Sequence, residues 1–161
     1  MRILKPLKIL SIFTLSIVPA AVLSASYKET YECKFEDGLA MRPTPERVVF
    51  SVADIGRGVQ LHEVEIPKIT TSSGFGDVKQ DNPKLLAIKW FGENYTFTAS
   101  GRTYASNVSR YDAIDMLYHE FSIKLNRKTM KAIAQSKSHI SYASRDGFAH
   151  GKCVAIASPK D

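Results

Sequence analysis

The alternation of apolar and polar side chains is the feature that most restricts how this chain can fold. Residues 31–36 read YECKFE and residues 121–125 read FSIKL, so every second side chain is apolar. A period of two is typical of half-buried β-strands, whose successive side chains point to opposite faces. Turn residues separate several segments of this kind: 47–54, 59–66, 85–91, 130–134 and 148–157. The pattern predicts an all-β domain, an antiparallel barrel or sandwich of about eight or nine short strands.

Two stretches depart from regular alternation. The apolar phase slips between Leu61 and Val64, which predicts a β-bulge, because one extra residue moves the following side chains to the other face. Residues 70–83 are rich in glycine, serine and aspartate, and we expect a long surface loop there. Loops of this length are often functional.

Two further segments predict a defined local structure. Residues 85–91 and 95–99 flank the turn sequence Gly-Glu-Asn at 92–94, and this arrangement is typical of a β-hairpin. The segment 109–118 fits two structures, because a helix-capping sequence opens it while alternate residues from Leu117 onward fit one strand face. We expect one short helical turn at 109–118 that leads into a strand.

Residues 1–26 have the organisation of a secretory signal peptide. Three basic side chains in the first eight residues precede an apolar stretch at 9–18, and a proline and small residues then lead to Ser26. The apolar stretch is short for a membrane span, which needs about 20 residues. We expect cleavage near Ser26, which leaves residues 27–161 as a single β-rich domain without a transmembrane anchor. Its expected location is periplasmic or secreted.

The chain has two cysteines, Cys33 and Cys153, which lie near the two ends of that domain. An exported chain reaches an oxidising compartment, where two thiols in one small domain usually pair. The disulfide would join the first strand to the last. Because bridged Cα atoms must lie within about 7 Å, the same bond predicts that these two strands are neighbours.

Charge is unevenly distributed along the domain. Residues 122–161 carry eight basic and two acidic side chains, whereas residues 27–121 carry 11 basic and 14 acidic ones. A basic face attracts an anionic envelope surface, and solvated strand faces that balance one another in the fold give the same counts. We expect an anionic envelope surface or a protein as partner. The domain's small basic excess predicts no nucleic-acid partner.

The sequence contains no motif that indicates catalysis. The four histidines, His62, His119, His139 and His150, lack the spacing of known metal sites such as H-E-x-x-H. Nucleophile-elbow, paired-carboxylate and phosphate-cradling glycine motifs are also absent. We therefore expect no metal, no cofactor and no enzymatic activity. The leading interpretation is an exported, non-enzymatic β-domain that acts by binding or within the cell envelope.

Aromatic residues are concentrated around residues 90–97. Alternation should send some of these rings into the core, where they form cross-strand pairs. If side chains do not fill the barrel interior, Trp90 and Phe97 would instead line an apolar ligand pocket. A carrier of a small apolar ligand is therefore one alternative function.

A second alternative comes from a resemblance to the periplasmic inhibitors of c-type lysozyme. Three short fragments are similar: YEC ending at Cys33, SGRTY at 100–104, and KC ending at Cys153. The resemblance implies a small single-disulfide β-barrel that presents its S-G-x-x-Y loop, here Ser100, Gly101 and Tyr104, to the cleft of the enzyme. The K-G element that follows this loop in the family is absent here. Lysozyme inhibition is thus an alternative rather than the leading interpretation.

Overall fold

The protein is described by a computed structural model that places residues 27–36, 43–97, 119–138 and 146–157. Within these residues the secondary structure is entirely β, which confirms the expected fold class. The strands are β1 (Tyr27–Phe35), β2 (Arg47–Ala53), β3 (Gly58–Glu65), β4 (Ile69–Thr70), β5 (Gly74–Asp81), β6 (Leu85–Phe91), β7 (Thr96–Phe97), β8 (His119–Asn126), β9 (Lys131–Ser138) and β10 (Gly147–Ile156).

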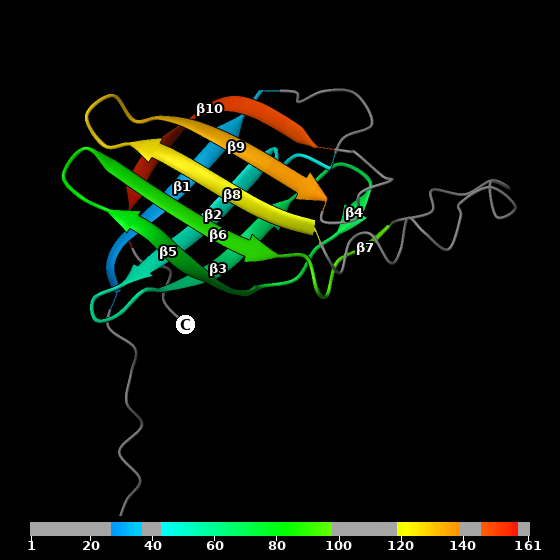
Figure 1. The fold of residues 1–161 in the computed structure, drawn as a ribbon, viewed down its shortest axis with the longest axis horizontal. Helices are drawn as coiled ribbons and strands as arrows, with labels where there is room; N and C mark the ends of the chain where they lie inside the picture. Colours follow the sequence, from blue (N-terminus) through cyan, green and yellow to red (C-terminus); the bar gives the residue numbers. More distant parts are fainter. Residues whose placement is uncertain (1–26, 37–42, 98–118, 139–145, 158–161) are drawn as a thin grey trace, which may run out of the picture.

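Eight strands form a closed antiparallel barrel in the order β1-β10-β9-β8-β6-β5-β3-β2 (Figure 1). Strand β1 pairs with β10 on one side and with β2 on the other, so the sheet closes on itself. Of the two architectures expected, the barrel is therefore the correct one. The short strands β4 and β7 pair with each other in a separate two-stranded sheet.

Two expectations lie outside the described residues. They concern the signal peptide at 1–26 and the helical turn at 109–118. The part of the chain that the structure describes contains no helix long and apolar enough to cross a membrane.

Side chains fill the inside of the barrel. In β8, the alternate residues His119, Phe121, Ile123 and Leu125 are buried, and the residues between them are partly or fully exposed. Trp90 from the neighbouring strand β6 stacks on Phe121, with 5.6 Å between the ring centroids. An eight-stranded barrel has an interior just wide enough for side chains to fill. The interior of this barrel is therefore a packed apolar core.

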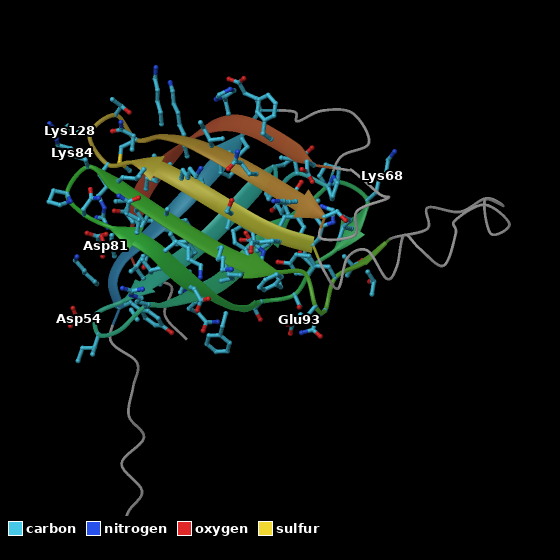
Figure 2. The ribbon with its side chains drawn as sticks, viewed as in Figure 1. Asp54, Lys68, Asp81, Lys84, Glu93 and Lys128 are labelled. Atoms are coloured by element: carbon cyan, nitrogen blue, oxygen red, sulfur yellow. A yellow bond between two sulfur atoms is a disulfide. The ribbon has the colours of Figure 1, made fainter. Side chains whose placement is uncertain are left out.

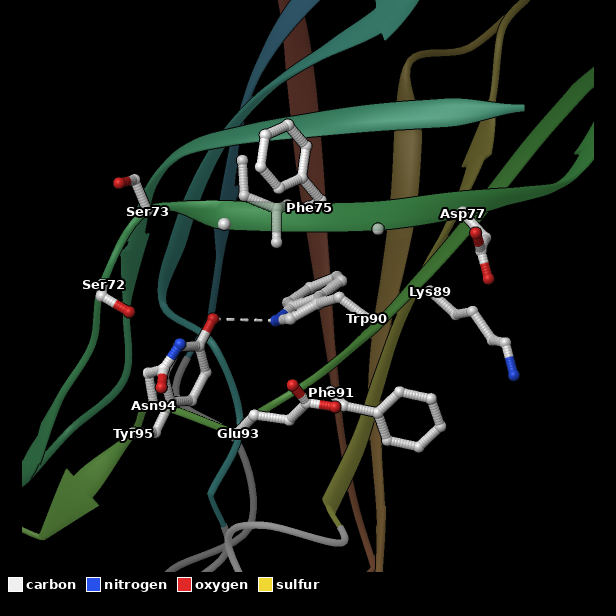
Figure 3. Close-up of a pocket in the computed structure, with 13 residues that line it drawn as sticks. Ser72, Ser73, Phe75, Asp77, Lys89, Trp90, Phe91, Glu93, Asn94 and Tyr95 are labelled. Carbon is white, nitrogen blue, oxygen red and sulfur yellow. Dashed lines mark hydrogen bonds between the residues drawn. The ribbon is translucent and has the colours of Figure 1, made fainter. Parts of the chain in front are cut away.

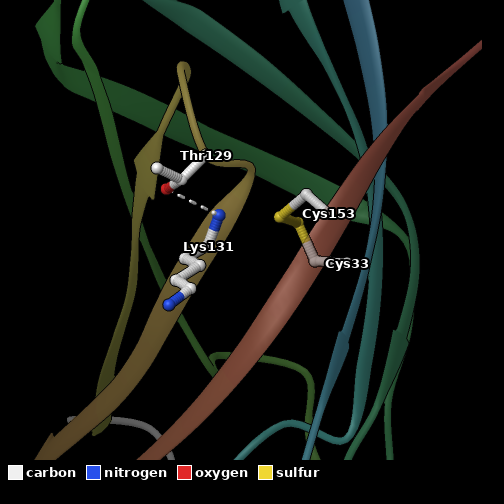
Figure 4. The surroundings of a disulfide bond; sticks show 4 residues. All are labelled: Cys33, Thr129, Lys131 and Cys153. Carbon is white, nitrogen blue, oxygen red and sulfur yellow. Dashed lines mark hydrogen bonds between the residues drawn. A yellow bond between two sulfur atoms is a disulfide. The ribbon is translucent and has the colours of Figure 1, made fainter.

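The predicted disulfide joins the first and last strands of the barrel. Cys33 and Cys153 lie directly opposite each other in the β1–β10 pairing, with their Cα atoms 3.9 Å apart (Figure 4). Both residues are buried, so the bond lies on the inner side of the barrel wall. The expectation that this bond connects the chain's first and last strands is confirmed.

The predicted bulge is present in β3. The pairing of β2 with β3 steps from Val49–Glu63 to Phe50–Leu61, which leaves His62 as the extra residue. Leu61 and Val64 are both buried as a result. Val64 lies three positions after Leu61, and regular alternation would place the two side chains on opposite faces. The bulge accounts for the slip in the apolar pattern.

The expectation of a loop over residues 70–83 is wrong, because this segment contains strand β5. Gly76 of this strand is an inward position: a Cβ atom there would lie 2.6 Å from the Lys89 carbonyl oxygen and 3.2 Å from the Trp90 Cβ. The close approach of β6 at Lys89 and Trp90 therefore requires glycine where most strands carry an apolar side chain. A strand whose inner residues are glycines lacks the apolar alternation by which strands are identified in a sequence.

The expectation of a hairpin after β6 is also wrong. The chain does turn at residues 92–94, and the Tyr95 N–H donates to the Gly92 carbonyl oxygen at 3.0 Å. However, β6 pairs with β5 and β8, while β7 pairs with β4. Because closure of the barrel gives the second edge of β6 to β8, the strand after the turn must pair elsewhere.

An ion-pair cluster around Arg127 closes one end of the barrel. Arg127, from the turn between β8 and β9, lies 2.6 Å from both Glu29 and Asp81, and its side chain is only 13% exposed. The Tyr31 hydroxyl donates to Glu29 at 2.9 Å. Burial, together with this hydrogen bond, raises the pKa of Tyr31 to about 12. In Figure 2, Asp81 marks this end of the barrel, and Glu93 lies toward the opposite end.

Candidate functional site

A cleft opens in the barrel wall where β5 and β6 separate. The pairing of these strands ends at Asp77–Lys89, and the cleft lies beyond this point, lined by residues 74–76 of β5 and 90–91 of β6. The cleft has a volume of about 440 Å³ (Figure 3). Ligand sites typically occupy about 300–1,000 Å³, so the cleft has room for a small molecule.

Trp90 and Tyr95 form the floor of the cleft. Both side chains are almost completely buried, and the Trp90 Nε1–H donates to the Tyr95 hydroxyl oxygen at 2.9 Å (Figure 3). Burial raises the pKa of Tyr95 to about 12, so the phenol keeps its proton at neutral pH. Within the described part of the chain, no acceptor takes that proton. The floor is therefore apolar and carries one hydrogen-bond donor that a ligand can use.

Two exposed phenylalanines stand beside the cleft. Phe75 on β5 is 80% exposed and Phe91 on β6 is 41% exposed, and both line the opening. Single exposed apolar residues are common on protein surfaces, whereas apolar residues gathered at an opening mark interaction sites. The two rings and the indole below them form a largely aromatic recess.

Polar side chains surround this aromatic recess. Ser72, Ser73, Glu93 and Asn94 lie toward the turn after β6 and the start of β5 (Figure 3). At the other side, Lys89 donates to Glu120 at 3.0 Å, and this hydrogen bond raises the pKa of Lys89. Because the Lys89 charge is compensated in this way, the cleft does not present an unpaired cation.

The sequence predicted only part of this site. Trp90 lies in the cleft floor, in the barrel wall rather than in an unfilled interior. The Phe97 backbone pairs with Ile69, and its side chain is outside the described part. Sequence reasoning missed Phe75 because its segment was interpreted as a loop; the signal was a large apolar residue between two glycines. Ser100, Gly101 and Tyr104 of the expected inhibitory loop lie outside the described residues.

The structure also brings together a serine and a histidine that the sequence did not connect. Ser51 Oγ lies 2.7 Å from His62 Nε2 and 2.7 Å from Thr30 Oγ1. A serine next to an imidazole is the arrangement of an activated nucleophile. Here, however, Ser51 is fully buried and its hydroxyl is held by two neighbours, so a substrate has no approach to it. This chain of hydrogen bonds links β1, β2 and the bulge in β3.

Metal-binding side chains are dispersed in the described part of the chain. Among those residues, no group of three or more His, Cys, Asp or Glu side chains is arranged to hold a metal ion. His119 is buried in the barrel beside Phe121, while His150 is exposed on β10. His139 lies outside the described residues.

Comparison with known family models, curated proteins and solved structures finds no match to this chain. What the cleft binds must therefore be inferred from its own chemistry.

Proposed function

We propose that this protein is an exported, non-enzymatic binding domain and that the cleft at Trp90 is its ligand site. The observation that carries this proposal is the opening between β5 and β6, whose lining includes the buried Trp90 and two exposed phenylalanines, Phe75 and Phe91. A packed barrel gains nothing in stability from exposing Phe75, because an apolar ring in water forgoes the favourable burial that drives folding.

The chemistry of the cleft favours a small ligand with a flat apolar part. Trp90, Phe75 and Phe91 offer aromatic surface, and aromatic pairs are attractive beyond their buried area. The Tyr95 hydroxyl would donate to an acceptor on the ligand. The proposal thus retains the carrier alternative but moves the ligand from the barrel interior to its wall.

An extracytoplasmic location is part of this proposal. The Cys33–Cys153 bond needs an oxidising compartment to form and persist, and small disulfide-linked domains are typical of exported proteins. The signal-peptide pattern of residues 1–26 supports the same location, periplasmic or secreted.

Trp90 makes a direct test feasible, because it is the chain's single tryptophan. The neutral dye 1-N-phenylnaphthylamine would be titrated into the protein, with energy transfer from Trp90 to the dye as the signal. We expect Phe75→Ser to weaken dye binding roughly 3- to 10-fold, the effect of losing one aromatic contact. Phe75 is exposed, so this change should leave the fold intact.

Phe148→Ser is the matched control, because Phe148 is 47% exposed on β10, outside the cleft. It should leave dye binding unchanged. The same dissociation constant for the wild-type protein and Phe75→Ser, or an equal loss with Phe148→Ser, would contradict the proposed site.

A further inference from the structure

Three lysines lie directly opposite one another on three neighbouring strands. Lys34 of β1 pairs with Lys152 of β10, and Lys152 pairs in turn with Lys131 of β9. All three are exposed on the outer face of the barrel. Figure 4 shows that the Lys131 side chain extends away from the disulfide on the inner face. We call these three residues the lysine row.

Among the described residues, the fold compensates the charge of the lysine row only at Lys34. Lys131 and Lys152 form no ion pair with any described carboxylate, and Lys34 approaches only Glu32, at 3.6 Å. Like charges directly opposite each other in a sheet are destabilising. Folding alone therefore gives no reason for this arrangement.

A shallow groove of about 1,120 Å³ lies along the lysine row. Lys124 of β8 adds a further cation to its lining, and Glu36 is the carboxylate that the described lining contains. Leu85 and Ile133 add apolar surface in the same groove. The groove therefore combines cationic head groups with an apolar base.

Exposed apolar side chains continue along the same face. On β10, Phe148 and Val154 alternate with inward residues just as Lys152 does, and they are 47% and 55% exposed. Phe148 lies opposite Gln135 and Val154 opposite Glu32, one on each side of Lys152 along β10. A soluble polyanion would need only the lysines. Apolar side chains on the same face as lysines suit a lipid–water interface, where the cations meet phosphate groups and the apolar groups enter the acyl boundary.

We propose that this face binds peripherally to the surface of a bilayer rich in anionic phospholipid. The lysine row and Lys124 attract the lipid phosphates, and Phe148 and Val154 insert between the lipid molecules. The proposal is independent of the cleft, because the two sites share no lining residue.

The test is sedimentation of the protein, purified from the extracytoplasmic fraction, with vesicles of phosphatidylglycerol and phosphatidylcholine or of phosphatidylcholine alone. We expect binding to the anionic vesicles only. In the triple variant Lys34→Gln, Lys131→Gln, Lys152→Gln, binding should fall on the order of 100-fold, from about 1 kcal/mol for each lysine at an anionic surface. Added salt should weaken binding of the wild-type protein, since it shortens the Debye length.

The control variant Arg57→Gln, Lys68→Gln, Lys79→Gln removes the same charge from exposed positions away from the lysine row. It should bind the anionic vesicles nearly as well as the wild-type protein. An equal loss in both triple variants would overturn the proposal, because net charge alone would then explain binding.

Phe148→Ser, Val154→Ser keeps every cation and separates a lipid surface from a soluble polyanion. It should weaken vesicle binding several-fold and leave binding to inorganic polyphosphate unchanged. Vesicle binding equal to that of the wild-type protein would overturn the lipid assignment. Phe75→Ser should bind vesicles normally, so a failure here is distinguishable from a failure of the proposed cleft.

Discussion

Two outward charges of β1 have different surroundings: Glu32 belongs to a group of ion pairs, whereas Lys34 lies between two cations, Arg47 of β2 and Lys152 of β10. On the β2 side, Arg47 lies 2.7 Å from Glu32, 2.6 Å from Glu63 and 2.9 Å from Glu65. These hydrogen bonds raise the pKa of Arg47, and the bond from Arg47 lowers the pKa of Glu32. We call these four residues the Arg47 cluster. Within it, every charge has an opposite partner.

Lys34 lies opposite Arg47 on the β2 side and opposite Lys152 on the β10 side, so it faces a cation on each side. Lys34 and Glu32 are only two residues apart, and both point outward from the same strand. The contrast shows that this barrel can pair charges across its strands where pairing supports the fold. Lys131 and Lys152, which form no ion pair with a described carboxylate, are therefore better explained by a partner outside the chain than by folding.

The β1–β10 pairing, which brings Lys34 and Lys152 together, also carries the disulfide. In the β1–β10 pairing, Cys33–Cys153 is followed immediately by Lys34–Lys152. Because successive side chains alternate between faces, repulsion on the outside lies directly beside a disulfide on the inside. The β1–β2 seam has ion pairs on its outer face instead.

Among the changes that test this comparison, removal of the disulfide should lower the melting temperature most. The bond spans 120 residues of sequence, for which the loop-entropy relation gives about 4–5 kcal/mol, and residual structure in the reduced chain lowers this to a few kcal/mol. In Cys33→Ala, Cys153→Ala, the melting temperature should fall by roughly 6–15 °C. Part of this loss should return at high salt, because salt screens the lysine row. Thermal unfolding at low and high salt measures both effects; a variant as stable as the wild-type protein would contradict them.

The sequence was sufficient for the parts of the fold that local periodicity controls. Residues 31–36 and 121–125 alternate as predicted, and both segments are barrel strands with apolar sides inward. The cysteine pairing followed from the compartment and from the number of thiols, and it placed the first strand next to the last. The two-residue alternation of the strands and the disulfide between the first and last strands therefore predict most of the barrel.

The candidate sites depend on contacts that periodicity does not contain. The glycine at Gly76 of β5 is explained only by the close approach of Lys89 and Trp90, which lie on a different strand. In the same way, Lys34, Lys131 and Lys152 become neighbours only when the barrel closes in its observed register. The uneven charge along the chain suggested a basic face, but the pairing of strands decides where such a face lies.

Arg47→Met should have the next largest effect, because it breaks the compensated side while keeping an apolar stem. Glu32, Glu63 and Glu65 would then lose their shared guanidinium, although Lys34 would remain 3.6 Å from Glu32. Exposed ion pairs contribute up to about 1 kcal/mol, and we expect a loss of about that size in urea unfolding. The matched change Lys131→Met removes a cation from the lysine row and should cause no loss. Equal destabilisation by both changes would show that the two sides do not differ.

Acid should weaken the Arg47 cluster through Glu32. The resulting loss of stability should be smaller than that caused by Arg47→Met. The pKa of Glu32 is lowered by its hydrogen bond from Arg47, below the ordinary value of 4.5. A lowered carboxyl pKa contributes stability above the ordinary value, and that stability is lost as pH falls through the lower, folded-state pKa. Glu32→Gln should therefore flatten the decline in melting temperature below about pH 4.5, the ordinary value. Parallel declines in the two proteins would contradict this assignment.

Relief of the two repulsions at Lys152 in the lysine row should give the smallest effect on stability, and it has the opposite sign. Lys152 faces a lysine on each side, so Lys152→Gln removes two unfavourable pairs. Each pair is worth a few tenths of a kcal/mol, so the melting temperature should rise by about 1–2 °C. Lys137→Gln is the control, because Lys137 lies opposite Glu120 and should give no increase.

The same Lys152→Gln protein should bind anionic vesicles about fivefold less tightly, at about 1 kcal/mol per lysine. A variant that is more stable and binds less would show that the row is kept for its partner. A lower melting temperature would mean that the lysines stabilise the barrel after all.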